Sequence, residues 1–83
     1  MVRIKFMAEG GAAVFSKLSP QEREILLLIS QGRTNREIAK TLFLEEGTIR
    51  NYVSNILTKM NMNNRSQAAA YARQHKLKEY KPG

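Results

Sequence analysis

Two segments in the first half of the chain combine a helix start signal with apolar residues at helical spacing. Ser19 is followed by a proline and then by Glu22, three residues after the cap, which is the spacing of a capping box. The helix that begins there ends at Gly32, a residue suited to a left-handed C-cap. The same capping spacing recurs at Thr34 and predicts a second, short helix over about 35–42.

The clearest pattern covers residues 46–60. At about 100° per residue, one side of a helix there is apolar, with Ile49, Val53, Ile56, Leu57 and Met60. The opposite side carries Gly47, Arg50, Asn51, Ser54 and Thr58. Only a short turn separates this helix from the one before it, which predicts a helix-turn-helix over about 35–54. A helix supported by another helix, with Arg and Asn facing solvent, is suited to the major groove of DNA.

A fourth helix is predicted over about 65–75, because Asn64 can cap an alanine-rich segment. The expected fold class is therefore all-α, a four-helix bundle containing a helix-turn-helix, over residues 18–77. Residues 1–17 are expected to form a linker or disordered lead, and residues 78–83 a polar tail.

The charge favours a polyanionic partner. The chain has a net charge of +7, and residues 33–83 carry ten basic and four acidic side chains, a net of +6. With no Cys, no Asp and a single His, the chain lacks the residues for a thiolate zinc site, another metal site or a catalytic triad. We therefore expect no enzyme, no cofactor and no metal. No apolar run approaches the ~20 residues of a membrane span, so a cytoplasmic protein without membrane association is expected.

With these elements placed, residues 18–77 resemble the LuxR-type helix-turn-helix domain. This domain is the output module of NarL/FixJ response regulators and of stand-alone bacterial regulators of the GerE kind. The resemblance rests on Glu22 to Glu24, Gly32, Asn35-x-Glu37-Ile38-Ala39, Leu42-x-Leu44, Thr48-Ile49-Arg50, Lys59-Met60 and Arg65. Two positions depart from the family pattern, since Glu45 stands where Ser or Thr is usual and Tyr52 where His is common.

The resemblance implies a set of DNA contacts. The third helix would be the recognition helix, with base contacts from Arg50, Asn51 and Ser54. Arg can pair with guanine and Asn with adenine, although Arg50 could instead contact a phosphate. Contacts to the DNA backbone are expected from Thr34, Asn35, Arg36, Thr48, Tyr52, Lys59 and Arg65. Alternatively, Arg65 could form an internal ion pair with Glu22 or Glu24.

The resemblance also implies a homodimer through the fourth helix, by way of Ala70, Tyr71 and Gln74. The predicted function is sequence-specific binding of double-stranded DNA by a transcriptional regulator. A phospho-accepting receiver domain would lie upstream and outside this chain, because the chain contains no Asp. Two alternatives are the promoter-reading domain of a sigma factor and a protein-interaction module on a helix-turn-helix scaffold.

Overall fold

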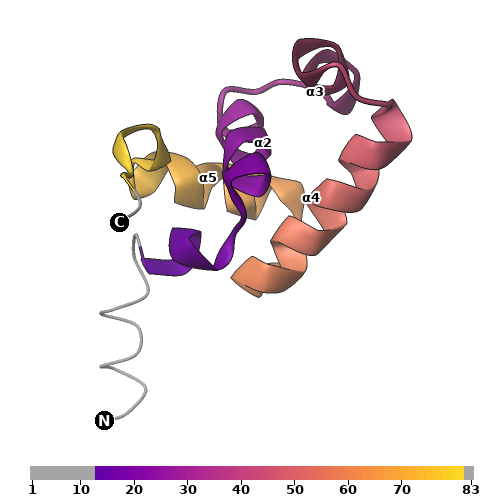
Figure 1. Ribbon diagram of the computed structural model, residues 1–83. Helices are drawn as coiled ribbons and strands as arrows, with labels where there is room; N and C mark the ends of the chain where they lie inside the picture. The colour runs from indigo at the N-terminus through magenta and orange to yellow at the C-terminus, as the bar shows by residue number, and fades with distance from the viewer. Residues whose placement is uncertain (1–12, 82–83) are drawn as a thin grey trace, which may run out of the picture.

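The computed structural model describes residues 13–81, and its regular elements in that range are all helical (Figure 1). The α-helices are α2 (Pro20–Ser30), α3 (Asn35–Leu42), α4 (Glu46–Met60) and α5 (Arg65–Gln74). Short 3₁₀ helices flank them, η1 (Val14–Lys17) before α2 and η2 (Leu77–Glu79) after α5. The all-α fold class and the four predicted helices are confirmed.

The predicted start signals of α2 and α3 form as expected. The Ser19 hydroxyl accepts the Glu22 amide at 3.1 Å, and the Glu22 carboxylate accepts the Ser19 amide at 2.8 Å. Thr34 and Glu37 repeat this reciprocal pair at 3.1 and 2.9 Å. Each box satisfies backbone amides that a helix start otherwise leaves without partners. Local sequence therefore determines where both helices begin.

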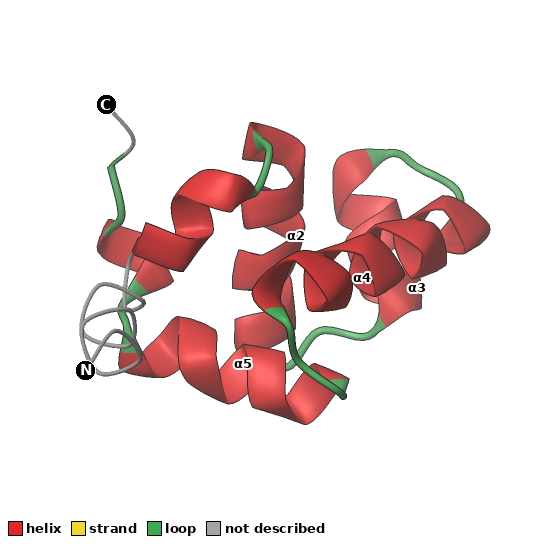
Figure 2. Ribbon diagram, turned by 90° about the horizontal axis from the view of Figure 1, so that it is seen from below, coloured by secondary structure: helices red, strands yellow, loops and turns green. Residues whose placement is uncertain are grey.

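Helix α2 occupies the centre of the bundle. It packs against α4 and α5, while α3 packs mainly on α4. Figures 1 and 2 both show α3 and α4 on one side of α2 and the C-terminal end of the chain on the other. The largest fully buried aliphatic side chains come from three helices: Ile25, Leu26, Ile38, Ile49 and Ile56. The apolar faces predicted for α2, α3 and α4 thus meet in one core.

The segment before α2 differs from the prediction of a linker or disordered lead over residues 1–17. In η1, the Phe15 side chain is completely buried. Its ring meets those of Tyr71 and Tyr80 edge-on, with centroids 5.9 and 5.6 Å apart. The prediction is therefore wrong for residues 14–17, because a single 3₁₀ turn has too few residues to show a periodic pattern. Residues 1–12 lie outside the described part of the chain.

In the predicted polar tail over residues 78–83, Lys78 and Glu79 are exposed, whereas Tyr80 departs from the prediction. Leu77 is buried in η2, and Tyr80 is half-buried against the core. Arg23 of α2 holds the segment before that helix, because its guanidinium donates to the carbonyls of Phe15 and Leu18 at 3.3 and 2.7 Å. The same guanidinium lies 5.5 Å from the centre of the Tyr80 ring, within the range of a cation–π contact. The segments on both sides of the four-helix unit therefore help to complete its core.

Candidate nucleic-acid interface

The turn between α3 and α4 is short and closed by backbone hydrogen bonds. Phe43 takes a left-handed conformation at φ +58°, and the Leu44 amide donates to the Ala39 carbonyl at 2.9 Å. Only Phe43, Leu44 and Glu45 separate α3 from α4, which begins at Glu46. Because Ile38 and Ala39 are buried where α3 packs on α4, the two helices form one rigid unit.

The three predicted base-contacting residues lie on the exposed face of α4. Arg50, Asn51 and Ser54 are all exposed, and their side chains have no hydrogen-bond or ion-pair partner within residues 13–81. Thr48 and Tyr52 flank them and are half-buried, with Tyr52 packed against the core. This face therefore offers polar groups that the fold itself does not use.

The Arg50 side chain runs back toward the start of α4, as helical side chains do. A Cβ atom at Gly47 would lie 3.6 Å from Nη2 of Arg50, so the guanidinium passes over the bare backbone of the glycine. Glu45 and Glu46 are exposed nearby in sequence, and the Glu45 side chain makes no cap hydrogen bond. The start of the candidate recognition helix thus carries two acidic groups beside its cationic one.

The start of α3 supplies the predicted phosphate-binding residues. Thr34 and Arg36 are exposed, and Asn35 is half-buried. The Thr34 hydroxyl accepts the Glu37 amide, which leaves its own O–H free to donate. The first amides and the positive dipole end of a helix favour an anion. The structure therefore places these three residues where a phosphate contact is possible.

Lys59 has a role in the fold that the sequence did not indicate. Its ammonium lies 2.8 Å from the Glu22 carboxylate, which is almost completely buried. Burial by itself raises the pKa of Glu22, but hydrogen bonds from Lys59 and Ser19 outweigh it, so the pKa lies below its ordinary value. Lys59 thus links the end of α4 to the capping box of α2. Lys59 and Glu22 are 37 residues apart in the sequence, so no local pattern reveals the pair.

Arg65 also bonds within the chain, but not as an ion pair. The alternative of a pair with Glu22 or Glu24 is wrong, because Glu22 is held by Lys59 and the Arg65 guanidinium reaches another segment. Its Nη1 donates to Oδ1 of Asn35, and its Nη2 donates to the Arg33 carbonyl at 2.6 Å. Arg65 therefore joins the start of α5 to the connection between α2 and α3.

The predicted dimer face on α5 is only partly exposed to solvent. Ala70 and Gln74 are exposed, whereas Tyr71 is half-buried. The Tyr71 ring contacts Phe15 and lies 4.2 Å from the His75 ring, centroid to centroid. Burial raises the pKa of the Tyr71 phenol. Tyr71 thus belongs partly to the domain's own core, which reduces the surface that α5 can offer to a second copy.

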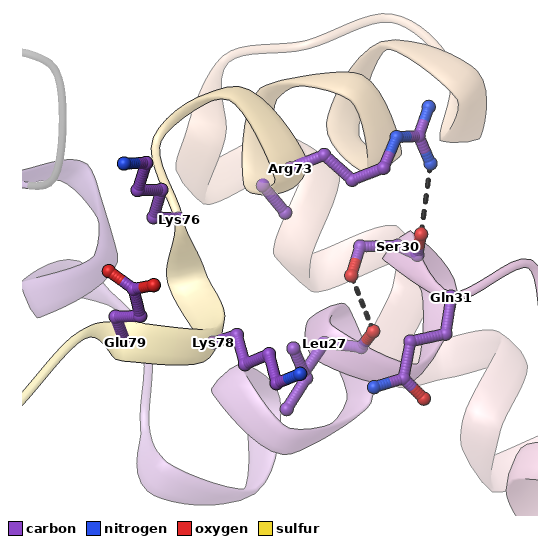
Figure 3. Close-up of a pocket in the computed structure, with 8 residues that line it drawn as sticks. Leu27, Ser30, Gln31, Arg73, Lys76, Lys78 and Glu79 are labelled. Carbon is purple, nitrogen blue, oxygen red and sulfur yellow. Dashed lines mark hydrogen bonds between the residues drawn. The ribbon is translucent and has the colours of Figure 1, made fainter.

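A hollow of about 340 Å³ lies between α2, the end of α5 and η2 (Figure 3). In it, Arg73 donates to the Ser30 carbonyl at 2.9 Å and so satisfies the end of α2. Lys76, Lys78 and Glu79 complete its edge in Figure 3. None of the predicted DNA-contacting residues lines this hollow, so it is separate from the exposed face of α4.

The described part of the chain contains neither a metal-binding cluster nor a membrane-spanning helix. Within residues 13–81, no three His or carboxylate side chains gather closely enough to hold a metal ion. None of the helices in that range combines the length and apolar character that crossing a bilayer requires. The exposed face of α4 and the start of α3 therefore remain the strongest candidate site.

Comparison with known proteins identifies the domain type. Residues 16–72 match the family described as bacterial regulatory proteins, luxR family. The DNA-binding transcriptional activator DevR/DosR of Mycobacterium tuberculosis is 48% identical over 67 residues, covering 81% of this chain and 30% of that protein. The response regulator protein VraR of Staphylococcus aureus is 39% identical over 77 residues, covering 93% of this chain and 37% of that protein.

The chain thus spans about a third of the length of these relatives. The matched region includes α2, α3 and α4 and most of α5. The expected resemblance is confirmed over the whole helix-turn-helix unit, and the chain belongs to the luxR family of bacterial regulatory proteins.

Proposed function

We propose that this chain is the DNA-binding output domain of a bacterial response regulator and that α4 enters the major groove. The observation that carries the proposal is the exposed face of α4, where Arg50, Asn51 and Ser54 have no partner within residues 13–81. Unpaired donors and acceptors on a rigid helix can bond directly to base edges. Membership of the luxR family and the similarity to a DNA-binding transcriptional activator support it.

The contacts divide into two kinds. Arg50 donates to N7 and O6 of a guanine, Asn51 pairs with an adenine, and Ser54 bonds to a neighbouring base. Phosphates are bound at the start of α3 and beside the recognition face, by Thr34, Asn35, Arg36, Thr48 and Tyr52. Lys59 and Arg65 do not bind phosphates directly in this proposal, because each already has a partner within the chain.

The domain binds as a homodimer on two half-sites, through Ala70 and Gln74 of α5 with Tyr71 at the edge. Because Tyr71 also packs on Phe15, this contact is weak in isolation and is strengthened when DNA aligns the two copies. Control by phosphorylation requires a receiver domain outside this chain, since the chain has no Asp. The relatives named as response regulator proteins support that arrangement.

Selection of bound duplexes from a random pool tests the proposal. We expect an enriched site with two half-sites and a stoichiometry of two chains per duplex. Binding to that site should weaken steeply with salt, by about 10³-fold between 50 and 200 mM if six phosphates are neutralised. A scrambled duplex of the same length serves as the control. The absence of any enriched sequence, or a salt-independent affinity, would exclude sequence-specific DNA binding.

One observation favours the alternative of a protein-interaction module. The Phe43 side chain is 93% exposed at the turn between α3 and α4, where an apolar partner could cover it. The two readings differ in the role of the α4 face, because only DNA binding requires Arg50. The sigma-factor alternative is not supported, because the chain belongs to the luxR family and α5 packs closely on α2.

A further inference from the structure

The start of α3 is connected to the start of α5 by a single side chain. Arg65, the first residue of α5, donates from Nη1 to the carboxamide oxygen of Asn35, the first residue of α3. From Nη2 it donates to the Arg33 carbonyl at 2.6 Å. The guanidinium therefore holds two points of the segment that leads into α3.

These bonds determine the orientation of the Asn35 carboxamide. A guanidinium can only donate hydrogen bonds, so the carboxamide oxygen, and not its nitrogen, must face Arg65. The two N–H donors of the carboxamide then remain on the other side of the group. Within residues 13–81 they have no acceptor. A half-buried amide is thus fixed with its donors available.

The charged groups around Asn35 are mainly cationic, with Arg33, Arg36 and Arg65 against the Glu37 carboxylate, which accepts the Thr34 amide at 2.9 Å. Arg65 has no carboxylate partner in the described residues, and it lies between the positive dipole ends of α3 and α5. Exposed Arg36 follows Asn35 directly. An anion with several acceptor oxygens, such as a DNA phosphate, fits free N–H donors in this setting.

We propose that Arg65 is a positioning residue, which holds the Asn35 carboxamide with its N–H donors presented to a DNA phosphate and does not bind the phosphate itself. This rests on the proposed function. Pre-orienting the amide removes the cost of ordering a side chain at the moment of binding. The phosphate contact of Asn35 then depends on a residue 30 positions away in the chain.

Three variants test the proposal: Arg65→Lys, Asn35→Ala and the double variant. Lysine keeps the charge and can bind phosphate, but it lacks the fork that bridges Asn35 and the Arg33 carbonyl. Affinity for the selected duplex is measured at several salt concentrations. We expect each single variant to lose about tenfold and the salt slope to fall by about 0.9, as for one lost phosphate contact. The double variant should be no weaker than either single one.

Other outcomes contradict the proposal. If Arg65 binds the phosphate directly, Arg65→Lys keeps most of the affinity and the full salt slope. If Arg65 is only structural, Arg65→Lys lowers the melting temperature, its effect adds to that of Asn35→Ala, and the slope stays unchanged. Circular dichroism confirms that each variant is folded at the binding temperature. Should Arg65→Lys not fold, Arg65→Gln replaces it, and the test then rests on Asn35→Ala and the double variant: a direct contact by Arg65 leaves Asn35→Ala without effect, whereas positioning makes the double variant no weaker than either single one.

A measurement without DNA separates this proposal from the proposed function. The side-chain amide of Asn35 should be rigid by ¹⁵N relaxation in the wild-type chain and mobile in Arg65→Lys, with Asn51 as the exposed reference. An amide that is equally mobile in both proteins would overturn the positioning role even if DNA binding stands. A rigid amide in a chain that binds no duplex would overturn the DNA function instead.

Discussion

On the α2–α5 side of the domain, the guanidinium groups of Arg23 and Arg73 end on carbonyls of their own chain, whereas Arg50 on α4 has no partner within residues 13–81. Arg23 and Arg73 bond to carbonyls of connecting segments and of a helix end, including those of Leu18 and Ser30. Arg50 lies on the exposed face of α4, where its guanidinium bonds to no carbonyl of the described residues. Cationic side chains in this small domain therefore divide between holding the fold and remaining available for a ligand.

The largest expected effect on stability comes from the ring contacts of Phe15 with Tyr71 and Tyr80. Phe15→Ala removes a completely buried ring and should cost about 3–5 kcal/mol of unfolding free energy. Phe43→Ala is the matched control, because that ring is 93% exposed and its loss should change stability by less than about 0.5 kcal/mol. Urea denaturation measures both. Equal effects of the two substitutions would show that the segment before α2 is not part of the core.

On the α4 side, Arg50→Ala should leave stability unchanged and weaken DNA binding. We expect a loss of about 1–3 kcal/mol in binding free energy, with relaxed preference at one guanine of the selected site. Lys78→Ala removes the same charge from η2 and controls for the change in net charge. Fluorescence anisotropy with the selected duplex measures both variants. If the two lose affinity equally, Arg50 contributes only charge, and the protein-interaction alternative gains support.

A third prediction concerns the Lys59–Glu22 pair, which lies between the two regions. Lys59→Met should destabilise the fold by roughly 1–2 kcal/mol at pH 7, a modest value because Lys59 is partly exposed to solvent. The pKa of Glu22 is lowered in the folded protein, so the unfolded chain takes up the proton first. This contribution is therefore complete above the ordinary Glu pKa of about 4.3 and is lost as the pH falls below it.

The difference in unfolding free energy between wild-type and Lys59→Met should accordingly shrink between pH 7 and pH 3. Denaturation curves at several pH values check this. A difference that stays constant over the whole range would mean that the ion pair does not stabilise the fold.

The smallest expected effect lies at the start of α4. Glu45 makes no side-chain cap hydrogen bond, whereas threonine at that position can accept a backbone amide. Glu45→Thr should stabilise the domain by about 0.5–1 kcal/mol. It should also tighten DNA binding several-fold, because a negative charge near the phosphates is removed. Glu79→Thr, which removes an acidic group from η2, is the control for net charge. Weaker binding of Glu45→Thr would indicate that the carboxylate itself contacts a base.

Much of the fold followed from local signals. The capping boxes of α2 and α3 need only residues three positions apart, so the sequence predicts them directly. The two faces of α4 follow from helical periodicity in the same way. Which side of α4 is buried, and hence that Arg50 and Asn51 are exposed, was therefore predictable from the chain alone.

Contacts between distant segments were not predictable in this way. Phe15 lies in a single 3₁₀ turn, and its ring packs on those of Tyr71 and Tyr80, which are far from it in the sequence. Lys59 and Arg65 were expected to contact the DNA backbone, with an ion pair to Glu22 or Glu24 as the alternative for Arg65, because nothing near them in sequence identifies their partners.

The sequence by itself determined the four α-helices, their starting points and the exposed polar face of α4, because each depends on residues within one or two turns. Only the tertiary structure decided which cations hold the fold and which remain free. Lys59 reaches Glu22 across 37 residues and Arg65 reaches Asn35 across 30, and these distances close only when the helices pack. The same packing lets Arg65 orient the Asn35 carboxamide at the start of α3.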